Sequence, residues 1–193
     1  MDHFARALHL GRRTGSAWTE GHCHNGLGII CTTLGALDSA ADHLQLGLTI
    51  FRDIGERRGE GIALTNLGVV WRALGRTSDA IICQRQAVAV FEETQNFDSR
   101  AMVLCRLGDL YGDQKRFGEA VAHYREALRT YREQRNRRQT GLTLAGLGEI
   151  QFASGEAEAA RRSWQEALTI YAEIDDPQAA ELRGRLATTT DDA

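Results

Sequence analysis

The sequence contains almost no proline and almost no lysine, and it has no long hydrophobic run. Pro177 is the only proline and Lys115 the only lysine among 193 residues. Because proline interrupts helices and cannot donate to a sheet ladder, its near absence permits long, uninterrupted helices. The basic residues are otherwise all arginine. We read that bias as a property of a GC-rich genome and give it no chemical meaning.

Several further absences limit where the chain could work. No run of 18 apolar residues occurs, so we expect no membrane span. The first residues, MDHFARALHLGRR, lack an apolar core followed by a small-residue cleavage site, so we expect no signal peptide. Four cysteines (Cys23, Cys31, Cys83 and Cys105) are too few for a disulfide framework in a chain of this length. These features predict a cytoplasmic protein.

The charge pattern and the missing motifs exclude two function classes. The formal net charge of -3 argues against nucleic-acid binding, which needs a clustered excess of basic residues. The sequence contains no nucleophile elbow, no glycine-rich phosphate loop and no HExxH helix. We therefore expect no enzymatic activity and no cofactor.

What the sequence does contain is a repeat, because four kinds of residue recur at a spacing of 40. The first series is a Leu-Gly pair, whose glycines are Gly28, Gly68, Gly108 and Gly148. The second is Ala40, Ala80, Ala120 and Ala160, and the third is Gly47, Ala87, Ala127 and Ala167. The fourth is aromatic: Phe51, Phe91, Tyr131 and Tyr171. Self-similarity at this period is typical of a stacked repeat array.

Within each period the apolar residues follow helical spacing. Ile62, Leu64, Leu67, Val70, Trp71 and Leu74 form one such stripe. We expect a first helix of each pair, the A helix, at 18–34, 57–74, 97–114 and 137–154. The second, the B helix, is expected at 38–54, 78–94, 118–134 and 157–174. Gly35, Gly75 and Gly155 suit the left-handed residue that ends a helix, with Asp38 and Ser78 as N-caps.

The repeat also predicts how the chain is divided. Residues 2–13 align with residues 42–53 and 122–133, so residues 1–14 are expected to be the second helix of a truncated preceding repeat. The complete units are 15–55, 56–95, 96–135 and 136–175. Residues 176–188 are expected to form a C-terminal capping helix, opened by Asp176-Pro177, and residues 189–193 a disordered tail.

The unit resembles the tetratricopeptide repeat, whose pattern is W-x2-L-G-x2-Y followed by A-x3-F and a later alanine. Residues 64–71 read Leu-x2-Leu-Gly-x2-Trp and are followed by Ala80 and Ala87. The resemblance implies an all-α fold, a right-handed solenoid of antiparallel helix pairs. Gly68 and Ala80 would be small because two helix backbones approach there. The period of 40 rather than 34, with no proline after the B helix, implies helices about one turn longer.

The 40-residue form is similar to two groups of proteins within that family. One comprises the C-terminal arrays of actinobacterial transcriptional and signalling regulators. The other comprises eukaryotic adaptors that bind extended peptides in spindle orientation. The arginine-rich composition favours the first group.

The resemblance also implies a binding surface, because the family lines its concave face with A helices. The residues in those slots are Asn25, Thr65, Asn66, Val69, Arg72, Arg106, Asp109, Asp113 and Glu149. An asparagine can pair with a peptide amide, and an arginine can hold a carboxylate. The three acids make the later part of the face acidic, which favours a basic segment or a bound arginine. Alternatively, these residues are ordinary solvated helix positions.

Two other clusters carry weaker signals. His22, Cys23, His24 and Cys31 could suggest a metal site, but they contain neither the Cys-x2–4-Cys nor the His-x3–5-His spacing of zinc ligands. We therefore expect no metal. Arg57-Arg58 and Arg137-Arg138 lie where a B helix meets the next A helix. They are interpreted as solvated turns, with phosphate binding as the alternative.

Two hypotheses for function follow. The first is a module that binds a protein or peptide on the concave face, as the sensor or scaffold of a larger bacterial cytoplasmic regulator. The second is structural: the array self-associates into a homo-oligomer through residues 2–13, or packs on its own upstream domains and holds them inactive. Neither hypothesis requires contact with nucleic acid or a membrane.

Overall fold

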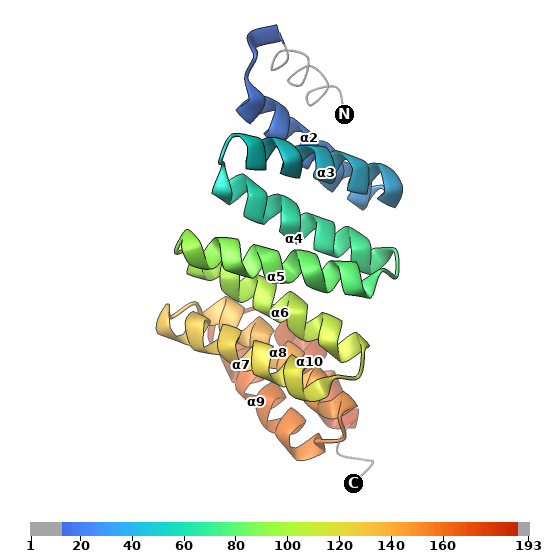
Figure 1. Cartoon of the computed structure of the whole chain (residues 1–193). Coiled ribbons are helices and arrows are strands. Elements are labelled where there is room, and N and C mark those ends of the chain that lie inside the picture. The colour runs from blue at the N-terminus through green and yellow to red at the C-terminus, as the bar shows by residue number, and fades with distance from the viewer. Residues whose placement is uncertain (1–12, 189–193) are drawn as a thin grey trace. The chain divides into compact units, whose positions relative to one another are not determined.

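The computed structural model describes residues 13–188, and all the regular elements in that range are helices (Figure 1). The chain divides into two compact units, which are Met1–Asn96 and Phe97–Ala193. We describe each unit by itself. Within residues 13–188, no helix is both long enough and apolar enough to cross a membrane.

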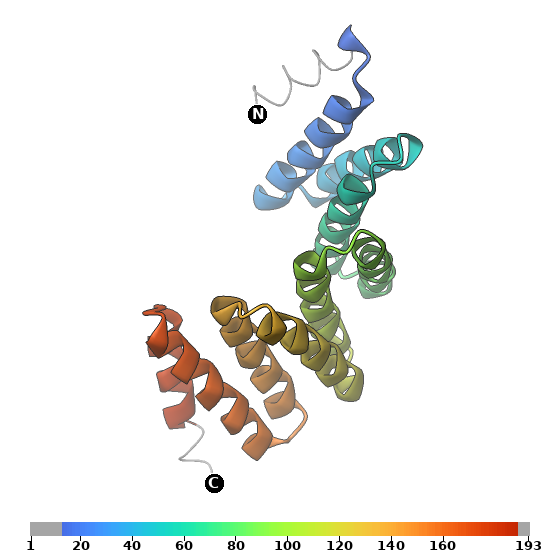
Figure 2. The ribbon, with the colours of Figure 1, turned by 90° about the vertical axis from the view of Figure 1, so that its left-hand side faces the viewer.

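Within residues 13–96, the first unit contains two helix hairpins. Its helices are α2 (Ala17–Thr33), α3 (Leu37–Asp53), α4 (Arg57–Ala73) and α5 (Thr77–Glu93). α2 packs on α3, and α4 packs on α5, while α3 and α2 both contact α4. Figure 2 shows α2 in blue and α3 in lighter blue from the side. The first helix of each hairpin is its A helix. The two A helices of this unit, α2 and α4, contact each other.

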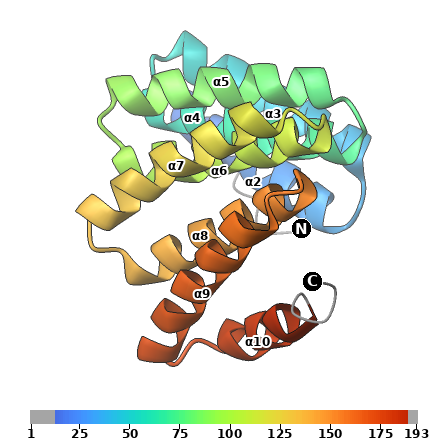
Figure 3. The ribbon, with the colours of Figure 1, turned by 90° about the horizontal axis from the view of Figure 1, so that it is seen from below.

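The second unit repeats this arrangement and adds one helix. Its helices are α6 (Phe97–Asp113), α7 (Phe117–Glu133), α8 (Arg137–Ala153), α9 (Ala157–Glu173) and α10 (Gln178–Thr188). α6 packs on α7 and on α8, α8 packs on α9, and α10 packs on α9 (Figure 3). The Asp176 carboxylate accepts a hydrogen bond of 3.0 Å from the backbone N–H of Gln178, which caps α10.

These observations confirm the predicted all-α solenoid of antiparallel helix pairs. Each helix from α2 to α9 spans 17 residues, and each predicted boundary differs from the observed one by no more than one residue. The expected half-repeat (1–14) lies almost entirely outside the described residues, and the expected tail (189–193) does so completely. The division into four units remains a prediction.

Each pair of helices is joined through a residue in the left-handed conformation. Gly35, Gly75 and Gly155 have φ of +76°, +73° and +86°, as the sequence predicted. Gln95 and Arg135 occupy the same position in other connections, with φ of +52° and +55°. An L-residue pays a steric cost there that glycine avoids. The geometry of the turn is thus kept even where the sequence does not supply glycine.

The prediction for the N-caps was wrong. α3 begins after Ala36 and α5 after Arg76, so Asp38 and Ser78 lie inside the first turns, and neither helix has a side-chain cap. The side-chain caps belong instead to A helices, where Ser16, Glu56 and Asn136 accept from backbone N–H groups three residues later. Asp38 remains favourably placed, because an acid in the first turn interacts well with the helix dipole.

The recurring small residues lie where the two helices of a pair meet. Ala40, Ala80, Ala120, Ala160, Ala87, Ala127 and Ala167 are all completely buried. A Cβ added to Gly28 would lie 3.2 Å from the carbonyl oxygen of Ala40, and one on Gly108 would lie 3.3 Å from that of Ala120. The backbones approach so closely that larger side chains would not fit.

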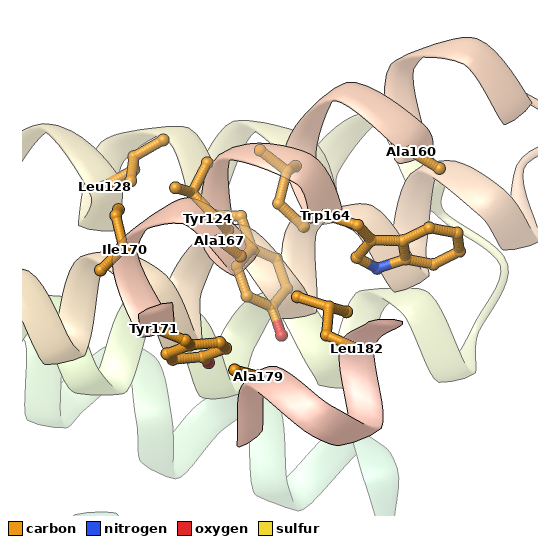
Figure 4. Close-up of a cluster of buried hydrophobic side chains, with 11 residues drawn as sticks. Tyr124, Leu128, Ala160, Trp164, Ala167, Ile170, Tyr171, Ala179 and Leu182 are labelled. Atoms are coloured by element: carbon orange, nitrogen blue, oxygen red, sulfur yellow. The ribbon is translucent and has the colours of Figure 1, made fainter. Parts of the chain in front are cut away.

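A B-helix side chain packs over each A-helix glycine. The pairs are Leu44 with Gly28, Gln84 with Gly68, Tyr124 with Gly108 and Trp164 with Gly148. Gln84 and Trp164 also donate side-chain hydrogen bonds, of 3.0 and 3.2 Å, to A-helix carbonyl oxygens. In the second unit the core continues through Tyr171 to Ala179 and Leu182, so α10 closes its end (Figure 4).

Candidate functional site

The A-helix face consists of the nine residues that the sequence assigned to the A helices: Asn25, Thr65, Asn66, Val69, Arg72, Arg106, Asp109, Asp113 and Glu149. In the first unit its two asparagines pair with each other. The Asn66 side chain on α4 donates a hydrogen bond of 3.2 Å to Oδ1 of Asn25 on α2. Asn25 is buried and Asn66 half-buried. This contact links neighbouring A helices and leaves Asn66 partly accessible.

Thr65 is the least accessible residue of the A-helix face on α4. Thr65 is only 4% exposed, and its hydroxyl donates a hydrogen bond of 2.8 Å to the carbonyl oxygen of Gly61 on the same helix. A threonine hydroxyl bound back to its own helix has no hydrogen left to donate to a partner. Val69 is half-buried and Arg72 is exposed, so these two remain accessible in the first unit.

In the second unit, one hydrogen-bond donor of the Arg106 side chain lacks an acceptor within residues 13–188. Its side chain is half-buried, and its Nε is buried with no acceptor among the described residues. A buried donor without an acceptor costs free energy, about 1–3 kcal/mol in typical cases. A ligand that supplied a carboxylate or carbonyl oxygen there would remove that cost.

Asp109 and Asp113 lie further along the same helix. Asp113 is exposed, whereas Asp109 is half-buried and accepts a hydrogen bond from the hydroxyl of Tyr124. A Cβ on Gly146 would lie 2.6 Å from that hydroxyl oxygen. Tyr124 therefore extends from α7 past the glycines to the A-helix face. The sequence did not reveal this, because an aromatic residue in that slot normally indicates core packing.

Glu149 is exposed on α8 and forms an ion pair with Arg185 on α10. Arg185 also contacts Glu181, with 3.2 Å between its Nη2 and the carboxylate oxygen. The three residues border a cavity of about 140 Å³ between α8, α9 and α10. Its other lining residues are Leu142, Ala145, Tyr171, Gln178 and Leu182. The acidic end of the face thus already holds an arginine, which belongs to this chain.

The hydroxyl of Tyr171 is a second unmet group, and its residue lines this cavity. It is buried and has no hydrogen-bond partner in the part of the chain that the structure describes. Burial raises the pKa of Tyr171 to about 12, so the hydroxyl keeps its proton. Tyr131, at the equivalent position in the previous repeat, donates instead to the carbonyl oxygen of Asp98 at 3.4 Å. α10 lies about 40 residues after α8, where the repeat predicts another helix. No sequence motif indicated a cavity beside it.

The residues of the histidine and cysteine cluster make contacts within the first unit. Nδ1 of His24 lies 3.1 Å from Nδ1 of His43, so the pair joins α2 to α3, while Cys23 and Cys31 are buried. No group of three or more metal-binding side chains occurs within residues 13–188. Cys105 lies 3.6 Å from the hydroxyl of Thr143, and burial raises the pKa of its thiol to about 11.

Three of the four arginines at the B-to-A junctions have acidic partners. Arg57 contacts Glu60 and Glu93, and Arg137 contacts Glu173. Arg138 contacts Asp176 at 3.2 Å.

Comparisons with known proteins agree with this architecture. The family model described as "Tetratricopeptide repeat" matches residues 23–93 and 99–173, more than half of the chain. None of the curated proteins compared with the sequence gives a significant match.

Solved structures share the fold at low sequence identity. BtubC from P. vanneervenii aligns with a TM-score of 0.77 and 20% identity, over 83% of this chain and 66% of that one. A signal transduction ATPase (STAND) with a tetratricopeptide repeat sensor, from Pyrococcus horikoshii, aligns with a TM-score of 0.84 and 14% identity, over 96% and 30%.

A Rap protein in complex with Competence and Sporulation Factor aligns with a TM-score of 0.70 and 17% identity, over 99% of this chain and 58% of that one. The chain therefore spans less than two thirds of each of these three structures. Identities this low show a shared fold alone.

Proposed function

The chain belongs to the tetratricopeptide repeat family, a family of non-catalytic scaffolds for protein–protein interaction. We propose that the second-unit part of its A-helix face, with Arg106, binds an extended peptide segment of a partner protein. The carrying observation is the buried Nε of Arg106, which lacks an acceptor among the described residues. A backbone carbonyl or carboxylate of the partner would satisfy it.

The cavity between α8 and α10 also supports the proposal of peptide binding. Leu142, Ala145 and Leu182 give it apolar walls, and the buried hydroxyl of Tyr171 is available to one polar atom. A volume of about 140 Å³ is suited to a side chain rather than a whole molecule. Glu149 and Glu181 share the single guanidinium of Arg185, so this end of the face has an excess of negative charge. The partner segment would therefore be basic where it meets α10.

The proposal can be tested with peptides selected from a random library displayed on phage. Affinities of the selected peptides would be measured by fluorescence polarisation for the native chain and for Arg106→Ala. We expect at least a tenfold loss for Arg106→Ala, at unchanged helicity by circular dichroism.

Arg129→Ala provides the matched control. Arg129 is an exposed arginine on α7, a B helix, and its removal makes the same change in net charge. Affinity should stay within about twofold of the native value. Equal losses in Arg106→Ala and Arg129→Ala would show that binding is non-specific attraction to arginine and would refute the proposed site.

The larger role that we propose is that of a sensor or scaffold within a bacterial cytoplasmic regulator. Support comes from the fold shared with the sensor repeat of the STAND protein and with the Rap protein in complex with Competence and Sporulation Factor. The coding sequence around this segment tests that role. An adjacent DNA-binding or ATPase domain would agree with it, and its absence from the complete gene would contradict it.

Self-association is a second candidate, favoured by apolar side chains on α2. Trp18 is 57% exposed and Ile29 is 45% exposed. Sedimentation velocity over a range of protein concentrations distinguishes the two ideas. A concentration-dependent dimer that Trp18→Ser abolishes would support self-association, and a strictly monomeric chain at high concentration would exclude it.

A further inference from the structure

A second hollow lies at the junction of α7, α8 and α9, away from the residues of the A-helix face. Its volume is about 470 Å³. The lining residues are Arg132, Arg135, Arg137, Thr140, Glu166 and Ile170. Arg132 comes from the last turn of α7, Arg135 from the connection and Arg137 from the first turn of α8. We call it the arginine cavity. Three guanidinium groups line it against the carboxylate of Glu166, and Glu173 pairs with Arg137 from outside the lining. One excess positive charge remains, which favours an anion.

The acids that contact these arginines hold them only weakly. Arg132 lies 2.5 Å from Glu166, and Arg137 contacts Glu173. All four side chains are about half exposed. Pairs this exposed contribute little, because water and salt compete with them. Among the described residues, none forms an ion pair or side-chain hydrogen bond with Arg135. All three arginines can therefore turn toward a ligand.

The equivalent place in the first unit shows what is different here. Eighty residues earlier, Arg52 and Arg57 stand where Arg132 and Arg137 stand in the second unit. There a buried acid, Glu60, contacts both: it lies 2.9 Å from Nε of Arg52 and also pairs with Arg57. The first unit thus neutralises its arginine pair internally.

The second unit has lost that acid and gained an arginine. Thr140 stands in place of Glu60 and is buried. Its hydroxyl donates a hydrogen bond of 2.8 Å to the carbonyl oxygen of Asn136. Arg135 replaces Gly55 in the same left-handed conformation, with φ of +55° against +69°. Both replacements make the site more positive, and Glu166, which stands where the first unit has Gln86, offsets one of them. The second unit therefore keeps one more positive charge than the first.

We propose that the arginine cavity binds a small molecule that carries a phosphate group. Guanidinium groups hold phosphate through paired hydrogen bonds, and a phosphate monoester presents several acceptor oxygens to the three guanidinium groups of the lining. The volume lies within the range of about 300–1,000 Å³ seen for small-molecule pockets, so it leaves room for more than a phosphate ion. Ile170 offers an apolar wall to the organic part.

Calorimetric titration of the native chain with adenosine monophosphate, inorganic phosphate and adenosine tests the proposal. We expect binding of one equivalent of adenosine monophosphate and no binding of adenosine. Equal affinity for inorganic phosphate would identify the phosphate group alone as the ligand. Weaker binding of inorganic phosphate would show that the apolar wall contributes. Failure of both phosphate probes, or binding of many equivalents, overturns the proposal.

Two variants take their design from the first unit. Arg135→Gly installs the residue found at Gly55, and it should preserve or improve the fold because glycine suits that backbone. Thr140→Glu installs the residue found at Glu60, which should pair with Arg132 and Arg137. We expect each to weaken adenosine monophosphate binding at least tenfold. Gln95→Gly, the same kind of change in a connection outside the cavity, should leave affinity unchanged. Native affinity in a folded Arg135→Gly protein overturns the assignment.

Discussion

The hydroxyl of Tyr124 on α7 donates a hydrogen bond to the carboxylate of Asp109 on α6. The tyrosine ring passes so close to two A helices that Gly108 and Gly146 have no room for a Cβ beside it. A residue of the core therefore fixes the position of an acid on the A-helix face. Packing and the proposed peptide site are coupled at this contact.

We predict that Tyr124→Phe lowers the free energy of unfolding by about 1 kcal/mol. A hydrogen bond to a charged group contributes roughly 1.5–3 kcal/mol, and partial exposure of Asp109 reduces that value. Urea unfolding measures the effect. In a double-mutant cycle, Asp109→Asn should cost less in the Tyr124→Phe background than in the native chain. Additive effects of the two changes would show that the contact does not stabilise the protein.

The small alanines allow a test of close helix packing. Ala120→Leu should destabilise the protein by about 1–3 kcal/mol, because Ala120 is completely buried and its carbonyl lies against Gly108. Ala122→Leu is the matched control, since Ala122 is exposed on the same helix. Thermal unfolding followed by circular dichroism compares the two. Similar melting temperatures for both variants would contradict the packing argument.

The sequence predicted the helices well because each boundary is marked by a periodic signal. The A-helix glycines and B-helix alanines recur every 40 residues, so one well-defined turn, such as that at Gly75, locates the others. The caps were harder to predict. Asp38 and Ser78 have suitable side chains, but the turn geometry starts each helix before them.

The candidate site was only partly predictable, because side-chain partners depend on neighbours in other repeats. Periodicity places Thr65 in a slot on the A-helix face, yet its hydroxyl binds its own helix. The same rule gives no hint that Tyr124 reaches Asp109, or that Arg185 of α10 pairs with Glu149. Which A-helix residues bind a partner remains a prediction.

The left-handed connections predict a gain in stability. Gln95→Gly should raise the free energy of unfolding by roughly 0.5–1 kcal/mol, because Gln95 has a φ of +52° that glycine adopts without strain. The reverse change, Gly75→Gln, should lower it by a similar amount, since Gly75 has a φ of +73°. Guanidinium chloride titrations of both variants measure the shifts. A destabilised Gln95→Gly protein would indicate that the glutamine side chain makes a contribution that outweighs the backbone cost.

Cys105 predicts how stability depends on alkaline pH. Burial raises the pKa of its thiol from 9.0 to about 11 in the folded chain. A group with a raised pKa contributes its full stability below the unfolded pKa and loses it as the pH rises through the folded pKa. Between about pH 9 and 11, the unfolded chain therefore releases a proton that the folded chain keeps. The resulting loss is up to roughly 1.4 kcal/mol for each pH unit.

Cys105→Ala tests this effect, because Ala145 occupies the same slot in the next repeat. The substitution also affects Tyr131, whose pKa is raised by burial and, in addition, by the charge of Cys105. Burial also raises the pKa values of Cys23 and Cys83, but both proteins share those groups, so their contributions cancel in the difference. Urea unfolding from neutral pH to about pH 11 should show the native chain losing stability faster than Cys105→Ala. Parallel curves would mean that the thiol titrates alike in the folded and unfolded chains, and hence that Cys105 is not shielded from water.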